Sequence, residues 1–253
     1  DDGLTYTFTL IDDAMWSDGT PLTAHDFEYA MLRALSYGVD NAYSIKEILD
    51  YLKGSKEYNQ AAIEAGSDFD CTVEDHSYVG IKATDDKTLV IELEAPCTFL
   101  PSLMCNRAWV ALPQDTPQHD SLWSLEPGYP TSGPYVLSEI NSTEKAVLTK
   151  SETYFNKDAI TMDSITFRVL ETPGHTPGSV CLIAGDVIFS GDTLFAGSCG
   201  RTDFPGGSGA AMRASLRRLY ELRGDYTVLS GHTGSTTLER ERKTNMFMQS
   251  ALG

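Results

Sequence analysis

The 253-residue sequence lacks several patterns that mark common classes of protein. No apolar run approaches the roughly 20 residues that a membrane-spanning helix needs. No Cys-x-x-Cys pair occurs, which argues against a zinc ribbon held by thiolates. Basic residues are scarce, since 19 Lys and Arg stand against 36 Asp and Glu, so nucleic acid is not expected as a partner. Asp1 to Gly3 lack the basic and apolar regions of a signal peptide.

Charge divides the sequence in two. From Leu170 onward eight acidic and eight basic residues cancel, so the whole net charge of −17 lies before that residue. The favoured basic residue also changes there from lysine to arginine. With 41% hydrophobic residues the chain has enough apolar material for packed cores. Such asymmetry indicates two pieces of different origin or environment.

The odd number of cysteines leaves at least one thiol free. A pair between Cys97 and Cys105 is open in an oxidising compartment, beside the alternative that every cysteine is a small buried or half-buried thiol. The five cysteines are Cys71, Cys97, Cys105, Cys181 and Cys199.

Before residue 165 the pattern alternates between strands and helices. Leu4 to Ile11 alternates apolar residues with threonine, which predicts a half-buried strand. Thr23 and Asp26 predict the start of a helix, in an acidic version of the capping box. The other expected elements are a helix carrying Ile45, Ile48, Leu49 and Leu52, a short helix and loop in 54–75, a strand at 88–94, a short turn or helix at 99–104, an extended run at 107–112, a loop at 113–131, and paired strands at 132–140 and 145–150.

The stretch from Ile165 to Ser179 begins as an alternating strand and ends in a Pro-Gly-His-Thr-Pro-Gly turn with His175 at its tip. Beyond it, Asp192 and His232 each follow a predicted strand. The elements expected here are strands at 180–183, 187–189 and 226–229, a helix carrying Met212, Leu216 and Leu219, and a helix over 237–248.

The first segment, about residues 1–169, resembles the family 5 extracellular solute-binding proteins, which are the oligopeptide- and dipeptide-binding components of ABC importers. The resemblance implies an extracytoplasmic location and a single lobe segment, because complete members are much longer. The Trp16 turn is expected to pack rather than to touch a ligand. The residues that carry the resemblance are Tyr6–Leu10, Trp16–Ala24, Asp26-Phe27, Thr131–Leu137, Ala146–Leu148 and Tyr154-Phe155.

The second segment, about residues 165–253, resembles the C-terminal half of the metallo-β-lactamase superfamily, closest to glyoxalase II-like hydrolases, and implies a cytoplasmic location. By this resemblance His175 would bind a first metal ion, Asp192 would bridge two ions and His232 would bind the second. Imidazole and carboxylate ligands suit zinc. The residues that carry the resemblance are Thr172–Gly178, Ser190–Phe195, Gly200–Asp203, Gly231-His232, Glu241-Arg242 and Asn245.

One departure from that superfamily leaves the enzymatic activity open. The HxHxDH motif that supplies the remaining metal ligands is absent, because no two of the five histidines lie within two residues of each other. His25 and His119-Asp120 are expected to be solvated surface residues. We therefore expect at most a weak or partial zinc site.

The expected fold is α+β, with a partial periplasmic-binding-protein-like lobe at 1–168 joined to half of a metallo-β-lactamase αββα sandwich at 169–253. The favoured function is a peptide- or solute-binding fragment of an importer fused to an incomplete hydrolase half, without the full activity of either. Two alternatives stand beside it, namely a zinc-dependent hydrolase of thioesters or related esters, and an engineered or artefactual chimera with no evolved function.

Overall fold

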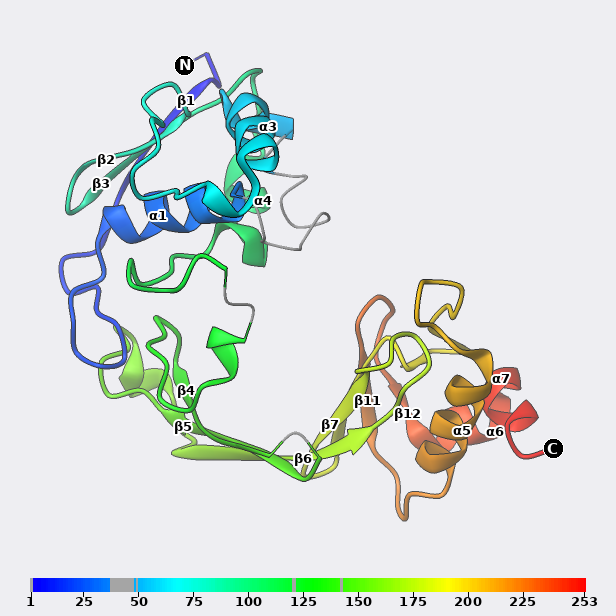
Figure 1. Ribbon diagram of the computed structural model, residues 1–253. Coiled ribbons are helices and arrows are strands. Elements are labelled where there is room, and N and C mark those ends of the chain that lie inside the picture. The colour runs from blue at the N-terminus through cyan, green and yellow to red at the C-terminus, as the bar shows by residue number, and fades with distance from the viewer. Residues whose placement is uncertain (1, 37–47, 49, 120–121, 142) are drawn as a thin grey trace. The chain divides into compact units, whose positions relative to one another are not determined.

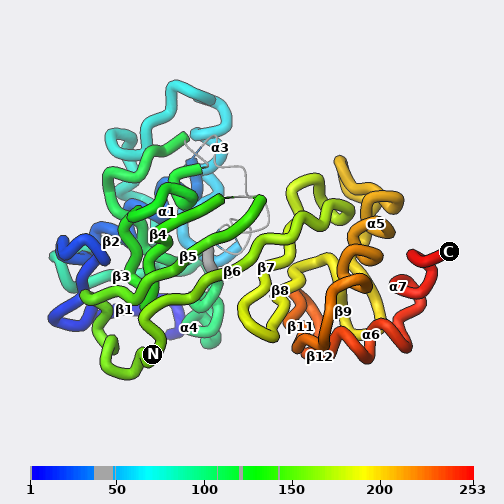
Figure 2. Tube along the Cα trace, turned by 90° about the horizontal axis from the view of Figure 1, so that it is seen from below, coloured from blue at the N-terminus to red at the C-terminus, as the bar shows by residue number. Residues whose placement is uncertain are grey.

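The computed structural model describes residues 2–36, 48, 50–119, 122–141 and 143–253. The chain divides into two compact units (Figures 1 and 2). The first comprises Asp1–Val136 and Lys150–Thr161, and the second comprises Leu137–Thr149 and Met162–Gly253. The boundary expected at residues 168–169 falls inside a strand, β6 (Ser164–Glu171), that belongs to the second unit.

The first unit contains a three-stranded antiparallel sheet in the order β1-β3-β2. Strands β1 (Thr5–Thr9) and β3 (Thr88–Glu92) confirm two sequence predictions. Strand β2 (Ile81–Asp85) was not predicted. The Asp85 carboxylate, at the end of β2, accepts hydrogen bonds from the backbone N–H groups of Lys87 and Thr88. These two local hydrogen bonds stabilise the tight turn that returns the chain into β3.

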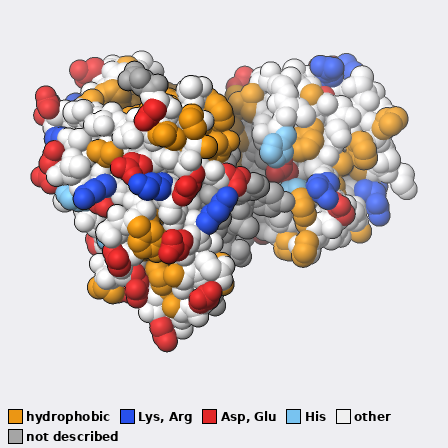
Figure 3. Space-filling model, turned by 90° about the horizontal axis from the view of Figure 1, so that it is seen from above, with side chains coloured by type: hydrophobic (Ala, Val, Ile, Leu, Met, Phe, Trp, Pro, Cys, Tyr) orange, Lys and Arg blue, Asp and Glu red, His pale blue; other side chains and the backbone are white. Residues whose placement is uncertain are grey.

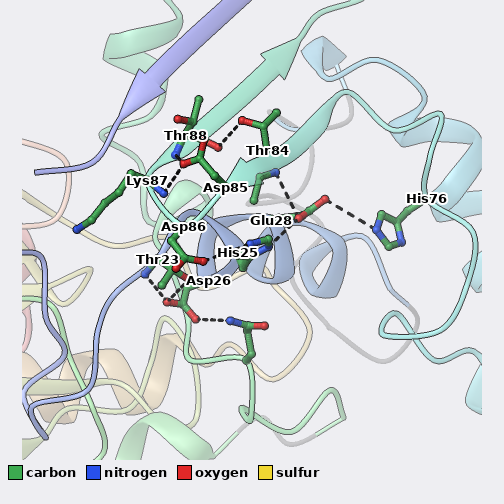
Figure 4. Close-up of polar contacts among 12 residues, drawn as sticks. Thr23, His25, Asp26, Glu28, His76, Thr84, Asp85, Asp86, Lys87 and Thr88 are labelled. Atoms are coloured by element: carbon green, nitrogen blue, oxygen red, sulfur yellow. Dashed lines mark hydrogen bonds and ion pairs between the residues drawn. The ribbon is translucent and has the colours of Figure 1, made fainter. Parts of the chain in front are cut away.

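Helix α1 (Ala24–Ala34) begins with the capping box that the sequence predicts. The buried carboxylate of Asp26 accepts a hydrogen bond from the Thr23 backbone N–H at 2.8 Å (Figure 4). It also accepts from Trp16 Nε1 at 3.3 Å and from Gln114 Nε2 at 3.1 Å. Trp16 is 4% exposed and packs in a small core cluster, as expected. One carboxylate therefore joins the helix start, the Trp16 turn and a distant loop.

Helix α1 and the sheet enclose the main core of the first unit, which includes Met31, Leu35, Ile81 and Ile91. Most of the helix expected around Ile45 to Leu52 lies outside the described residues. The remaining short elements are helices α3 (Ser55–Ala65) and α4 (Leu100–Leu103) and 3₁₀ turns at Gly66–Asp68, Arg107–Trp109, Trp123–Leu125 and Lys157–Ala159.

The extended run expected at 107–112 is wrong for its first half, which forms the 3₁₀ turn Arg107–Trp109. The side chain of Asn106 accepts a hydrogen bond from the backbone N–H of Ala108 at 3.1 Å. An asparagine in front of an apolar run thus changes the local structure. Its side-chain oxygen accepts a hydrogen bond from a nearby backbone N–H group, which in a strand would bond to the neighbouring strand.

The second unit is built on a seven-stranded sheet in the order β12-β11-β8-β7-β6-β5-β4. The predicted strand pair at 132–150 is confirmed, with a later start of the first strand. The strand bounds besides β6 are β4 (Tyr135–Asn141), β5 (Lys145–Lys150), β7 (Val180–Ala184), β8 (Val187–Gly191), β11 (Thr227–Ser230) and β12 (Thr236–Thr237), and a separate small pair joins β9 (Leu194–Phe195) and β10 (Ser198–Cys199).

Three helices lie on the same side of this sheet (Figure 1), namely α5 (Gly209–Tyr220), α6 (Leu238–Thr244) and α7 (Met246–Ser250). Met212, Leu216 and Leu219 are buried on α5, as predicted. The single helix expected over 237–248 is wrong, because Asn245 has an extended backbone with ψ of 110°. Its side chain accepts from the Phe247 and Met248 backbone N–H groups and so starts α7 anew.

All five cysteines are free thiols. The pairing left open between Cys97 and Cys105 does not form: Cys97 is buried and Cys105 is exposed. The expectation of small buried or half-buried thiols holds for the other four.

Acidic side chains are scattered over the surface of the first unit (Figure 3). None of the helices in the described ranges has both the length and the apolar character to cross a bilayer.

We predict that Asp26→Ala destabilises the first unit by about 2–3 kcal/mol, because it removes a cap and leaves the buried Trp16 N–H without an acceptor. All three tryptophans, Trp16, Trp109 and Trp123, lie in the first unit, so urea unfolding followed by tryptophan fluorescence measures this change directly. The matched control is Asp13→Ala at an exposed site, expected to stay within about 0.5 kcal/mol. Equal effects of the two substitutions would contradict the role of Asp26.

Candidate functional site

The topology of the second unit brings three strand ends to one edge. Strand β8 pairs in parallel with β11. Strand β6 is antiparallel to β7, and β7 is antiparallel to β8, so β6 runs in the same direction as β8. Strands that run together end at the same edge of a sheet. The chain leaves β6 toward His175, β8 toward Asp192 and β11 toward His232.

The three side chains meet at Asp192. His175 Nε2 lies 3.6 Å from Asp192 Oδ2, and His232 Nε2 lies 3.3 Å from Asp192 Oδ1. The side chains of His175 and Asp192 are 19% and 29% exposed, whereas that of His232 is 75% exposed. Each imidazole therefore faces a different oxygen of one carboxylate, and the site opens to solvent on the His232 side.

The loop that contains Arg201 and Phe204 holds the His175 ring in place. Its Nδ1 lies 2.8 Å from the carbonyl oxygen of Arg201. Since a carbonyl only accepts, Nδ1 carries the proton of this bond, and Nε2 keeps its lone pair toward Asp192 when the ring is neutral. The Phe204 ring meets the imidazole edge-to-face at 5.3 Å. The hydrogen bond from His175 Nδ1 to the Arg201 carbonyl orients the imidazole, as the second ring N–H commonly does in metal-binding histidines.

Arg201 is itself held in place. Its guanidinium donates to both oxygens of Asp203, each at 2.6 Å, and lies 4.3 Å from the centre of the Phe204 ring. The hydrogen bonds from Arg201 lower the pKa of Asp203 to about 2. Asp203 is therefore ionised at any physiological pH and pairs with the Arg201 guanidinium beside His175.

The backbone approaches Asp192 closely at two glycines, and at Gly200 no larger residue fits. A Cβ at Gly200 would lie 1.8 Å from the Asp192 carbonyl oxygen, and one at Gly231 would lie 2.9 Å from Asp192 Oδ1. That Oδ1 atom is buried and has no hydrogen-bond partner within the described part of the chain. His232 Nε2 lies 3.3 Å from this oxygen without forming a hydrogen bond, and a buried acceptor that receives no hydrogen bond is costly.

A second carboxylate, that of Glu241, links loops of the second unit by hydrogen bonds. Glu241 is fully buried. It accepts hydrogen bonds from the Gly197 backbone N–H at 2.8 Å, Thr236 Oγ1 at 2.6 Å and Asn245 Nδ2 at 2.9 Å. These bonds tie α6 to the segment that follows Asp192, so Glu241 acts as a structural carboxylate and not as a ligand.

The donors present do not complete a two-metal site. Asp192 could bridge two ions, because each of its oxygens faces one imidazole. Each ion would then have only two protein ligands, where a catalytic zinc has three. Among the described residues, no group of three or more His, Cys, Asp or Glu side chains is placed to hold a metal ion. The Asp192 oxygen that accepts no hydrogen bond and the oriented His175 imidazole are suited to a metal ion, but they make up only part of a two-metal site.

The first unit holds another row of titratable groups, which the sequence analysis missed (Figure 4). His25 Nδ1 lies 3.7 Å from Glu28 Oε2, and His76 Nε2 lies 3.8 Å from Glu28 Oε1. His25 Nε2 also lies 3.7 Å from Asp86 Oδ1. His25 is 42% exposed, which agrees with a surface position, and His119 is exposed. Only the helical spacing of His25 and Glu28 signalled this row, because the other partners come from distant loops.

Comparison with known proteins identifies the family of the chain. The profile of the bacterial extracellular solute-binding proteins, family 5, matches residues 1–191. The chain belongs to this family. It is 30% identical to the dipeptide-binding protein DppE of Bacillus subtilis over 171 residues, which cover 67% of this chain and 29% of that protein.

Solved structures agree with this family assignment. An oligopeptide-binding protein of Borrelia burgdorferi, OppAIV, superposes with a TM-score of 0.56 at 32% identity, over 66% of this chain and 31% of that one. The murein tripeptide-binding protein MppA of Escherichia coli gives a TM-score of 0.55 at 28% identity, over 66% of this chain and 30% of that one. Two-thirds of the chain thus has a mixed α/β fold similar to periplasmic oligopeptide-binding proteins. The chain spans less than a third of the length of these relatives.

A separate similarity concerns a hydrolase. The hydroxyacylglutathione hydrolase GloC of Haemophilus influenzae is 38% identical over 102 residues, which cover 38% of this chain and 48% of that protein. An uncharacterized protein of Aquifex aeolicus is 45% identical over 93 residues, or 36% of this chain. A partial glyoxalase II-like similarity therefore accompanies the solute-binding one.

Proposed function

We propose that the chain supplies part of the peptide-binding site of an extracytoplasmic importer component and carries a hydrolase-like half without a complete metal centre. The observation that carries the first part is the family match over residues 1–191, together with relatives whose names state dipeptide and oligopeptide binding. The division of the chain between a solute-binding segment and a hydrolase-like half-sandwich belongs to this proposal.

The described fold supports a structural role for the family motifs. Trp16 and Asp26 are buried in mutual contact and are not available to a ligand. A peptide site normally encloses most of its ligand, and this chain covers only 29% of DppE. We infer that the segment contributes contacts on one side of a peptide and binds weakly by itself.

A second candidate function, a metal-dependent hydrolase, is favoured by one observation. His175 and His232 both face Asp192, whose buried Oδ1 atom accepts no hydrogen bond from the described residues. A zinc ion, when bound, would supply a Lewis acid and an activated water. His175 and His232 would hold it with their Nε2 atoms, and the Arg201 carbonyl would keep the His175 ring oriented. The shortage of ligands leads us to propose a partial, weakly binding site without turnover.

We predict that the chain binds short peptides weakly or not at all, because one lobe segment cannot enclose them. Isothermal titration calorimetry against a mixed library of di- to pentapeptides tests this. The expected result is no saturable binding tighter than about 10 μM, or about −7 kcal/mol. A tighter saturable isotherm would show that this segment is a complete binding site and would overturn the proposal.

We predict that equilibrium dialysis against zinc loads at most one weakly held ion per chain, and that His175→Ala and His232→Ala each abolish it. The control is His119→Ala, an exposed histidine of the first unit, which leaves zinc uptake unchanged. Zinc-loaded chain is expected not to hydrolyse S-lactoylglutathione. Turnover that disappears in His175→Ala would contradict the account of the missing ligands.

A further inference from the structure

The second unit contains a cleft of about 390 Å³ between α5, α7 and the segment 199–202. This volume lies within the range of about 300–1,000 Å³ that is typical of small-molecule sites. The cleft is separate from the edge where the three polar side chains meet, since His175, Asp192 and His232 do not line it. It therefore belongs neither to the partial metal site nor to the solute-binding segment.

One part of the cleft is apolar. Met212 and Leu216 lie one turn apart on α5 and are almost fully buried, while Phe247 on α7 is 46% exposed. The half-buried thiol of Cys199 also lines the cleft. Burial raises the pKa of this thiol above its usual value, so the group is uncharged at neutral pH. These side chains offer an uncharged surface to an apolar group.

Hydrogen bonds hold the walls of the cleft in place. The side chain of Asn245 donates from Nδ2 to the Ser198 carbonyl at 2.9 Å, and its Oδ1 accepts from the Phe247 backbone N–H at 3.0 Å. It thereby ties β10 to the start of α7. Arg201, on the other wall, is fixed by its pairing with Asp203. A site whose walls are already ordered loses less free energy when a ligand binds.

The cleft also holds a positive charge without a counter-charge. Arg213, on α5, lines the cleft, and its Nη1 atom lies 3.8 Å from the position that a Cβ on Gly209 would occupy. The guanidinium thus lies against the first turn of its own helix. In the described parts of the chain, no carboxylate lies within ion-pair distance of Arg213. The other guanidinium of the cleft, that of Arg201, is already paired with Asp203.

The surroundings of Arg213 are basic as well. Arg213 also lines a neighbouring cleft of about 450 Å³, together with Arg217 and Arg218. The carboxylates of that second cleft are those of Glu221 and the last residue, Gly253. Glu221 is eight residues from Arg213 along the helix, a rise of roughly 12 Å. The nearby charge therefore favours an anion, although the chain as a whole carries a net charge of −17.

We propose that the cleft binds a small organic carboxylate with an apolar chain or ring. The apolar part lies against Met212, Leu216 and Phe247, and the carboxylate pairs with the Arg213 guanidinium. The planar fork of a guanidinium matches the two oxygens of a carboxylate. A neutral apolar molecule leaves that charge unpaired, and an inorganic anion leaves the apolar surface unused. The proposal does not rest on peptide binding or on zinc binding.

Alkylation of Cys199 by iodoacetamide tests the proposal at the site itself, because a bound ligand blocks access to this thiol. The full chain is treated in octanoate between about 0.05 and 20 mM, a range suited to a ligand of about ten non-hydrogen atoms. Mass spectrometry of the digested chain follows Cys199 and the exposed Cys105 of the first unit separately. We expect octanoate to slow the reaction of Cys199 by about fivefold or more and to leave Cys105 unchanged.

Two comparisons isolate the contribution of the charge. 1-Octanol, which has the same chain and no charge, is expected to need about tenfold higher concentrations for equal protection. Arg213→Gln is expected to weaken protection by octanoate about tenfold and to leave that by 1-octanol unchanged. The matched control is Arg223→Gln, an exposed arginine outside both clefts, which keeps the octanoate response of the unsubstituted chain.

Three results would overturn the proposal. They are Cys199 alkylation that octanoate does not slow, equal protection by octanoate and 1-octanol, and equal weakening by Arg213→Gln and Arg223→Gln. The first two are measured on the unsubstituted chain, so they decide the matter even if a variant fails to fold.

Discussion

The parallel pairing of β8 with β11, with β6 running in the same direction, is the constraint on which the second unit depends. It brings the ends of three strands to one edge, and it fixes which side chains of the sheet face the helices. His175, Asp192 and His232 are close because their strands end together. The glycines at 200 and 231 let the backbone approach Asp192 closely enough for this edge to close. The direction of these strands therefore suffices to bring the three polar residues together at one edge of the sheet.

Much of this arrangement could be predicted from local sequence. The alternation in β1 and β6 and the Thr23–Asp26 cap each act within a few residues, so their patterns are readable. Errors arose where a single side chain redirected the backbone. Asn106 converts an apolar run into a 3₁₀ turn, and Asn245 divides an amphipathic helix, because each amide satisfies backbone donors locally.

Long-range partners could not be predicted in the same way. The Arg201 carbonyl that orients His175 lies 26 residues away in the sequence, and no residue type marks a backbone acceptor. The row formed by His25, Glu28, His76 and Asp86 was missed for the same reason. Convergence of His175, Asp192 and His232 was expected from resemblance, and the strand directions now provide its physical cause. Their role toward a metal stays a prediction.

We propose that the two units of this chain fold independently of each other and that the hydrolase-like similarity belongs to the second unit. Urea unfolding followed by tryptophan fluorescence and by far-UV circular dichroism tests it most directly, because every tryptophan lies in the first unit. We expect that Glu241→Ala, which removes a buried carboxylate of the second unit, shifts part of the dichroism transition and leaves the fluorescence transition in place. A single transition, shifted equally in both signals, would contradict it.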